Sequence, residues 1–155
     1  MTLGSFKGRG KRLPKLADKS AIRAASLIVL LFLCSTVLLV VSMDRHVNVY
    51  DEGIILVGAS RVLAGDLIHR DFYANYGPGQ FYVLSALLSL FPPTVLVERG
   101  WDIAVRAGTT ILCYLIARQL SGRFLAGFVY ALSLIWLTSA GFYGYPVYPA
   151  LLFTL

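Results

Sequence analysis

The chain alternates between long apolar runs and one extended polar stretch. Its first apolar run, 24–43, reads AASLIVLLFLCSTVLLVVSM and carries no charge. A helix over these residues would be roughly 30 Å long, which is the hydrocarbon thickness of a bilayer. A cleavable signal peptide would have a shorter apolar core, of about 7–15 residues, and then a small-residue cleavage site. This run has neither feature, so we expect a retained transmembrane helix.

The polar stretch, 44–79, follows this run and holds most of the acidic residues of the chain. Within it, Glu52–Ala64 reads EGIILVGASRVLA, which is too short and too charged to cross a membrane. The spacing of its apolar residues predicts a helix lying along the membrane interface. Asp51 stands at the position of an N-cap, and Gly65 at the position of a helix-ending glycine. The acids of the stretch are Asp44, Asp51, Glu52, Asp66 and Asp71.

The remaining apolar runs predict further membrane spans. They cover residues 80–97, 101–120, 124–140 and 150–155, and the last run stops after six residues. Pro92-Pro93 breaks the first of them, so 80–97 either crosses the membrane or dips into it and returns. We expect it to cross, with 98–100 as an inner turn. Because the last run is cut short, we also expect the chain to be a fragment of a longer protein.

Composition and charge support a membrane protein with a defined orientation. The chain is 57% hydrophobic and 14% charged, whereas soluble domains are about 45–50% apolar and about 25% charged. Residues 1–23 hold seven of the fourteen basic residues and one acid, and a long apolar run follows at once. A basic tail in this position is better explained by the positive-inside rule than as an arm that binds nucleic acid.

The sequence therefore predicts an all-α, multi-pass protein of the cell membrane. Residues 1–23 would be a cytoplasmic tail, and the loop 44–79 would lie on the outer face. A full crossing by 80–97 places Arg118 and Arg123 outside, which the positive-inside rule disfavours, whereas a return places them inside.

Two groups of residues carry candidate chemistry. Asp51 and Glu52 are either an N-cap and a first-turn acid, or carboxylates that act on a hydroxyl at the membrane surface. Arg106 lies within an apolar run, so it is either the ion-pair partner of Asp102 or a functional cation. Exposed headgroup-level residues are the simplest interpretation of Arg61, His69 and Arg70. Neither histidine nor cysteine spacing indicates a metal site.

Several short motifs occur in a fixed order along the chain. Asp51-Glu52 is followed by LAGD at 63–66, RDFY at 70–73, a Gly-Pro-Gly turn at 77–79, and VRAG at 105–108. This order, together with LIARQLSG at 115–122, resembles the N-terminal third of the GT-C glycosyltransferases that use polyprenyl-phosphate sugars. Within that class, it is most similar to the family 39-like group of protein mannosyltransferases and lipid A aminoarabinose transferases. The similarity covers residues 24–155.

The resemblance implies transfer of a sugar, with inversion, from a polyprenyl-phosphate donor to an acceptor hydroxyl on the outer face. It puts the catalytic carboxylate on Asp51, with Glu52 as its acidic neighbour. Tyr76 stands where many members of the family have a lysine, so binding of the donor phosphate would fall to Arg70, to Arg106 or to a cation from a part of the protein outside this chain. The sugar and the acceptor stay open, and no cofactor is implied beyond the lipid-linked donor.

Two other functions remain open at this point. One is a non-catalytic multi-pass membrane protein, such as a transporter piece or an assembly subunit. The concentration of polar residues in a single outer loop favours the enzyme, because transporters place charges and broken helices near the midplane of several spans. The other is a chain that is inactive by itself.

Overall fold

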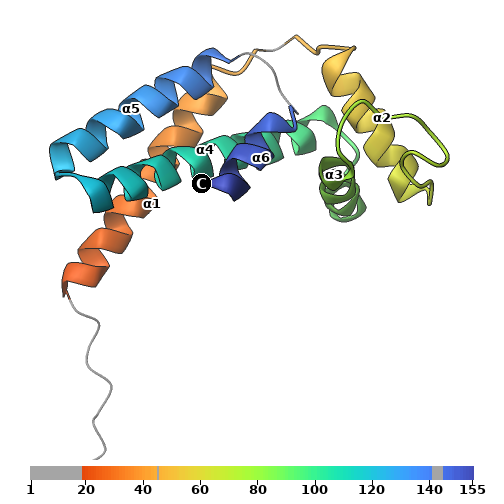
Figure 1. Cartoon of the computed structure of the whole chain (residues 1–155). Helices are drawn as coiled ribbons and strands as arrows, with labels where there is room; N and C mark the ends of the chain where they lie inside the picture. Colours follow the sequence, from red (N-terminus) through yellow and green to blue (C-terminus); the bar gives the residue numbers. More distant parts are fainter. Residues whose placement is uncertain (1–18, 45, 141–144) are drawn as a thin grey trace, which may run out of the picture.

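The regular elements of the structure are all helices. The computed structural model describes residues 19–44, 46–140 and 145–155, and within these ranges it contains six helices and no strand. The expectation of an all-α chain is confirmed. The helices, drawn in Figure 1, are α1 (Lys19–Val41), α2 (Asp51–Leu63), α3 (Pro78–Leu90), α4 (Val95–Leu120), α5 (Arg123–Ser139) and α6 (Val147–Thr154).

Helix α1 has the properties expected of the first apolar run. Among the described helices, it alone combines the length and the apolar composition of a membrane-crossing segment, properties that a signal sequence shares. It begins at Lys19 and so includes the last residues of the predicted basic tail, whose residues 1–18 lie outside the described part. Many of its large apolar side chains are exposed, among them Val29, Leu30, Leu33 and Val37. Such a surface suits a lipid environment better than water.

Helix α4 organises the molecule, because every other helix packs against it (Figure 1). Its start corrects one prediction: residues 98–100 are helical and do not form a turn. The break falls earlier, at Pro92-Pro93, because a proline disfavours helical backbone at the residue before it. Helix α3 ends at Leu90, and the predicted segment 80–97 therefore contains most of the 13-residue α3, a short break and the first residues of α4.

Buried hydroxyl groups join α1, α4 and α5 where these helices cross. The Ser35 hydroxyl lies 3.1 Å from that of Thr110 and 2.8 Å from that of Tyr130. Tyr130 in turn donates a hydrogen bond to the backbone carbonyl of Leu31 at 2.9 Å. Side-chain hydrogen bonds between helices fix their register where apolar packing alone is unspecific. The apolar core around them includes Leu39, Ile103, Ala107 and Ile111.

Helices α2 and α3 form a separate pair at the N-terminal end of α4. Ile55 and Ala59 are buried between them. Gly58 lets the ring of Phe81 approach so closely that a Cβ atom would lie 2.4 Å from Phe81 Cε1. The helix ends at Leu63, and Gly65, the predicted helix-ending glycine, follows the C-cap Ala64 with a positive φ of 103°. Its Schellman motif comprises hydrogen bonds from Gly65 N to Val62 O and from Asp66 N to Arg61 O.

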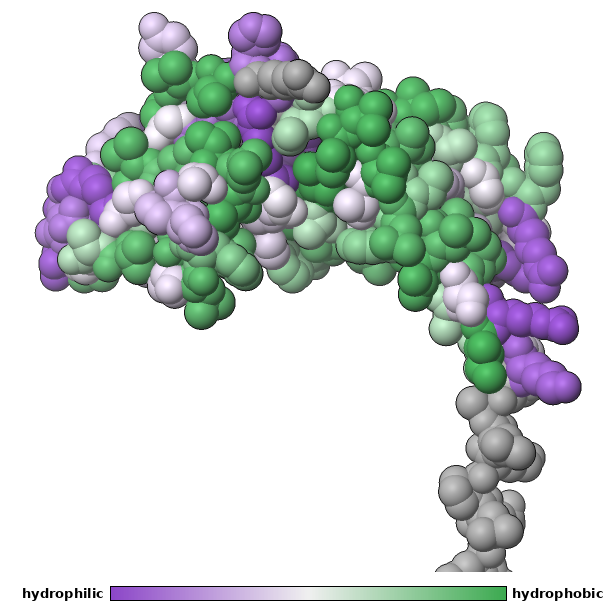
Figure 2. Space-filling view, turned by 180° about the vertical axis from the view of Figure 1, so that it is seen from behind, coloured by the Kyte–Doolittle hydropathy of each residue, from purple (hydrophilic) through white to green (hydrophobic). Residues whose placement is uncertain are grey.

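The other predicted runs match α5 and α6 closely. Helix α5 covers nearly all of 124–140, while α6 begins three residues before 150. Residues 141–144 of the aromatic connection between them lie outside the described part. The surface view in Figure 2 shows a broad apolar face, with hydrophilic side chains gathered at its two ends and in a patch at its upper edge.

Candidate functional site at the start of α2

The start of α2 is capped by Asn48, which corrects the N-cap predicted at Asp51. The Asn48 side-chain oxygen accepts hydrogen bonds from the backbone N–H groups of Tyr50 (3.1 Å) and Asp51 (3.3 Å). In return, Glu52 accepts a hydrogen bond from the Asn48 backbone N–H at 2.9 Å. This reciprocal pattern resembles a capping box. Asp51 is a first-turn residue whose carboxylate accepts a hydrogen bond from the Asn48 side-chain amide at 2.8 Å.

The structure brings together two predicted site residues, Asp51 and Tyr76. Tyr76 lies near Tyr145, which precedes α6, and close enough to Asp51 for that carboxylate to act on the pKa of its hydroxyl. The rings of Tyr76 and Tyr145 meet edge to face with their centroids 5.8 Å apart. Burial, then the neighbouring Tyr145, then the charge of Asp51 raise the pKa of Tyr76. Asp51 is half-buried, so its carboxylate is held in place while it stays accessible.

Glu52 faces the protein interior and anchors α2 to α4. Its carboxylate accepts two hydrogen bonds from Arg99, with Nε to Oε1 at 2.8 Å and Nη2 to Oε2 at 3.0 Å. The guanidinium group also donates to the backbone carbonyls of Asp44 (2.7 Å) and His46 (2.8 Å). Both side chains of the ion pair are at most 5% exposed. Glu52 is therefore a positioning residue for Asp51, its neighbour on the same helical turn, and is not exposed to a substrate.

The sequence interpretation missed Arg99 and Glu98. Both were assigned to an inner turn, whereas they lie on the first turns of α4 against the start of α2. Glu98 is fully buried, and neither carboxylate oxygen has a hydrogen-bond partner among the described residues. The sequence did hold a signal for these residues: Glu98 and Arg99 are adjacent opposite charges directly after an apolar stretch, where ionisable residues are usually paired or functional.

Arg70 lies in the exposed loop between α2 and α3. Its guanidinium group donates two hydrogen bonds to Asp71, at 2.9 and 2.8 Å. The hydrogen bond and charge of Asp71 raise the pKa of Arg70, and the same pairing, with the Leu67 backbone N–H, lowers the pKa of Asp71. Because this pair is exposed to solvent, an anion can compete for Arg70 at little cost.

Arg106 occupies the interior, in the arrangement predicted by the ion-pair alternative. Its Nε lies 2.7 Å from the Asp102 carboxylate. Its Nη1 donates to the backbone carbonyls of Leu137 (2.7 Å) and Ala140 (2.6 Å) at the end of α5. The group also stacks 4.0 Å from the centroid of the Tyr148 ring. Arg106 is 1% exposed, so this structure holds it for helix packing and gives a donor phosphate no access to it.

No protein-family model, curated protein or solved structure matches the chain. The chemistry of the site therefore rests on its own geometry. In the described part of the chain, no group of three or more His, Cys, Asp or Glu side chains has the arrangement of a metal site.

The arrangement suits a reaction at a hydroxyl group. Asp51 offers a carboxylate on a helix whose first turn is fixed by Asn48 and by the Glu52–Arg99 pair. Tyr76 places a neutral phenol beside it. A carboxylate and a phenol can together orient a hydroxyl and accept its proton.

Proposed function

We propose that the chain carries the acceptor-activating part of a membrane glycosyltransferase of the GT-C type, which takes its sugar from a polyprenyl-phosphate donor. The observation that carries this proposal is the half-buried Asp51 carboxylate, which the Asn48 side-chain amide holds on the first turn of α2. Tyr76 is near enough that, besides burial, the Asp51 charge raises its pKa. Asp51 and Tyr76 are the residues to which the motif resemblance gives the catalytic carboxylate and the family's lysine position. They are separated in the sequence, and their proximity is independent of the motif comparison.

A multi-pass arrangement in the membrane is part of the proposal. Helix α1 has the length and exposed apolar surface of a span, and α4 runs about 28 Å from Arg99 to Arg118. In the proposed arrangement α1, α4 and α5 cross the bilayer, while α2 and α3 lie at the outer face.

The Arg99 hydrogen bonds support a return of the segment 80–97 in place of a crossing. Arg99 bonds to Glu52 and to the backbone that follows α1, so both ends of this segment lie at the same end of the molecule. Arg118 and Arg123 then lie at the opposite end, beside Arg23 on α1. This distribution satisfies the positive-inside rule, which the crossing model did not.

In the proposed reaction, the acceptor hydroxyl oxygen attacks the anomeric carbon of the donor from the face opposite the phosphate. Asp51 orients this hydroxyl and takes its proton, while Tyr76 donates a hydrogen bond within the site. The bond between the anomeric carbon and the phosphate oxygen breaks, and polyprenyl phosphate leaves with the bonding electrons. Arg70 is the exposed cation of the loop that can exchange Asp71 for this phosphate.

A second candidate function is a non-catalytic membrane protein, such as an assembly subunit. It is favoured by the internal use of Arg99 and Arg106, which hold helices together. In addition, no cation in the described part of the chain lies within ion-pair distance of Asp51.

The test is sugar transfer by membranes that contain the gene product carrying this chain, with polyprenyl-phosphate sugars as donors. Asp51→Asn should lower the rate by about 10²- to 10⁴-fold, the usual contribution of a general base, without changing membrane insertion. Asp66→Asn is the matched control, because it removes a carboxylate that pairs with Arg61 in the same loop. Equal activity of the wild type and Asp51→Asn would leave Asp51 a purely structural role.

A further inference from the structure

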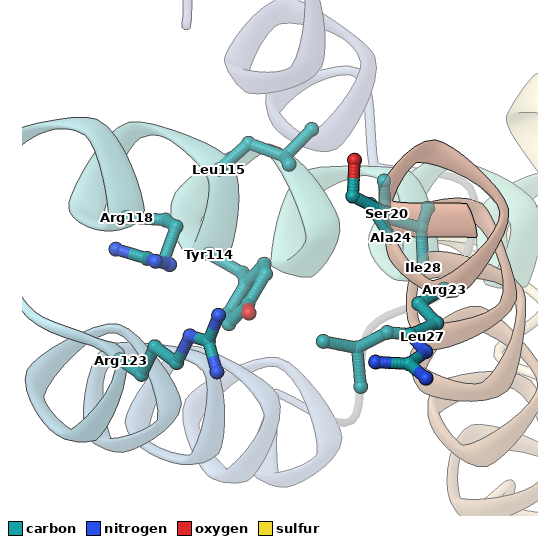
Figure 3. A pocket seen from close by; sticks show the side chains of 9 residues that line it. All are labelled: Ser20, Arg23, Ala24, Leu27, Ile28, Tyr114, Leu115, Arg118 and Arg123. Atoms are coloured by element: carbon teal, nitrogen blue, oxygen red, sulfur yellow. The ribbon is translucent and has the colours of Figure 1, made fainter. Parts of the chain in front are cut away.

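A pocket lies at the end of the molecule opposite Asp51, where α1, α4 and α5 meet (Figure 3). It has a volume of about 450 Å³ and is open on one side. Three arginine side chains line it, each from a different helix: Arg23 from α1, Arg118 from α4 and Arg123 from α5. Figure 3 shows the guanidinium groups of Arg118 and Arg123 on one side of the pocket and that of Arg23 on the other.

These three arginines form no ion pair with an acid in the described part of the chain. Among the described residues, their one side-chain hydrogen bond is long, from Arg118 Nη1 to the Ser121 carbonyl at 3.4 Å. The three arginines therefore place positive charge around one pocket, without a counter-charge from the described residues. An anion bound between them would supply this counter-charge.

The start of α5 adds to the same positive field. Arg123 is its first residue, no acid lies in its first turn, and its N-cap, Gly122, provides no side-chain hydrogen bond. A helix N-terminus carries a partial positive charge and free backbone N–H groups, so an arginine there is unfavourable unless an anion is also present.

Apart from Ser20, the rest of the pocket wall is mostly apolar. Leu27, Ile28 and Leu115 line it, together with the ring of Tyr114. A small soluble anion has no apolar surface to bury against such a wall, whereas the acyl chains of a lipid would cover it. The combination of a cationic rim and an apolar wall is the chemistry that recognises a phospholipid with a net negative charge.

We propose that this pocket, formed by Arg23, Arg118 and Arg123, binds the phosphate headgroup of an anionic phospholipid of the cytoplasmic leaflet. This inference rests on the membrane placement in the proposed function but not on the glycosyl transfer. The pocket is separated from Asp51 by the length of α4, so it is distinct from the site of the donor.

Binding is measured by native mass spectrometry of the chain purified in a neutral detergent, with phosphatidylglycerol and phosphatidylcholine as probes. We expect a clear preference for phosphatidylglycerol. Arg118→Gln with Arg123→Gln should reduce that preference by about fivefold for each charge removed. The single variant Arg123→Gln is compared with a matched control, Arg61→Gln. Each variant removes one positive charge, but the two charges lie at opposite ends of the molecule. This control should leave the preference unchanged.

Three outcomes would overturn the proposal. They are equal binding of the two lipids by the wild type, an unchanged preference in the double variant, and a loss of preference in Arg61→Gln equal to that in Arg123→Gln. A separate experiment replaces the lipid with inorganic phosphate and measures thermal unfolding. Thermal stabilisation by inorganic phosphate equal to that by phosphatidylglycerol would assign the pocket to a soluble anion.

If the double glutamine variant does not fold, the lipid preference of the single variant Arg123→Gln tests the proposal. Arg123 is exposed, so its replacement should not disturb folding. The double lysine variant, Arg118→Lys with Arg123→Lys, should keep most of the preference because it keeps the charges. Since binding is measured in detergent and without a sugar donor, its failure is distinguishable from failure of the transferase assay.

Discussion

Arg99 and Glu52 form a buried, two-bonded ion pair that joins the first turns of α4 and α2 across 47 residues of sequence. The same guanidinium group closes the connection after α1 by binding the carbonyls of Asp44 and His46. One side chain therefore fixes the relative position of three helices. The half-exposed carboxylate of Asp51 lies directly beside this anchor.

We predict that breaking this ion pair strongly destabilises the chain. Arg99→Gln or Glu52→Gln leaves a buried charge without its partner, which costs about 3–5 kcal/mol. The matched control is Arg70→Gln, which breaks an exposed two-bonded pair with Asp71 and should cost at most about 1 kcal/mol. Thermal unfolding in detergent measures both. Similar stability losses for Arg99→Gln and Arg70→Gln would show that the buried pair does not anchor the helices.

The contact between Gly58 and Phe81 yields a second prediction. Gly58→Ala places a methyl group where the ring of Phe81 lies, so the ring must move and stability should fall by about 1–3 kcal/mol. Gly127 lies within α5 with nothing near its Cβ position. Gly127→Ala should therefore stabilise the chain by up to about 1 kcal/mol, through helix propensity alone. Denaturant titration compares the two, and a stabilising Gly58→Ala would contradict the close approach.

The pairing of Asp51 with Tyr76 predicts a pH effect. Burial, Tyr145 and the Asp51 charge raise the pKa of Tyr76 above its ordinary value of 10. A group whose pKa is raised by folding stabilises the fold below its unfolded pKa, and this contribution is lost as the pH rises through the folded pKa. Asp51→Asn removes the negative charge and should therefore lower the pKa of Tyr76.

The pKa of Tyr76 can be measured by ultraviolet titration of phenolate, as the difference between each protein and its Tyr76→Phe counterpart. Asn48→Ala serves as the control, because it removes the cap of α2 but keeps the Asp51 charge. An Asp51→Asn protein with the wild-type pKa at Tyr76 would show that the two groups do not interact in solution.

The proposed membrane arrangement predicts which surface positions face outward. In a background with Cys34→Ser and Cys113→Ser, a Tyr73→Cys variant should react with a membrane-impermeant maleimide added to intact cells. A Ser121→Cys variant should react only after the membrane is opened. Tyr73 is highly exposed in the loop between α2 and α3. Ser121 lies in the connection between α4 and α5, at the end of the molecule where the arginine-lined pocket is found. Labelling of Ser121→Cys in intact cells would rule out the arrangement.

Much of the helical architecture could be predicted from local sequence. Uninterrupted apolar runs predicted α1 and α5, and the positive φ needed at the end of α2 explains why Gly65 could be identified as its terminator. The Pro92-Pro93 pair indicated a break, at which the sequence interpretation expected the chain to cross the membrane, whereas the proposed arrangement has it return. That choice depends on a contact between Arg99 and Glu52, which periodicity cannot detect because it involves distant residues.

The candidate site divides in the same way. The sequence by itself determined an acidic first turn on α2 and an exposed loop with Arg70, since these follow from residue order and local turn chemistry. Only the tertiary structure decided that Asn48 caps the helix, that Glu52 points inward to Arg99, and that Tyr76 lies near Asp51. These relationships depend on how α2 packs against α3 and α4, because side chains far apart in sequence become neighbours only when helices pack.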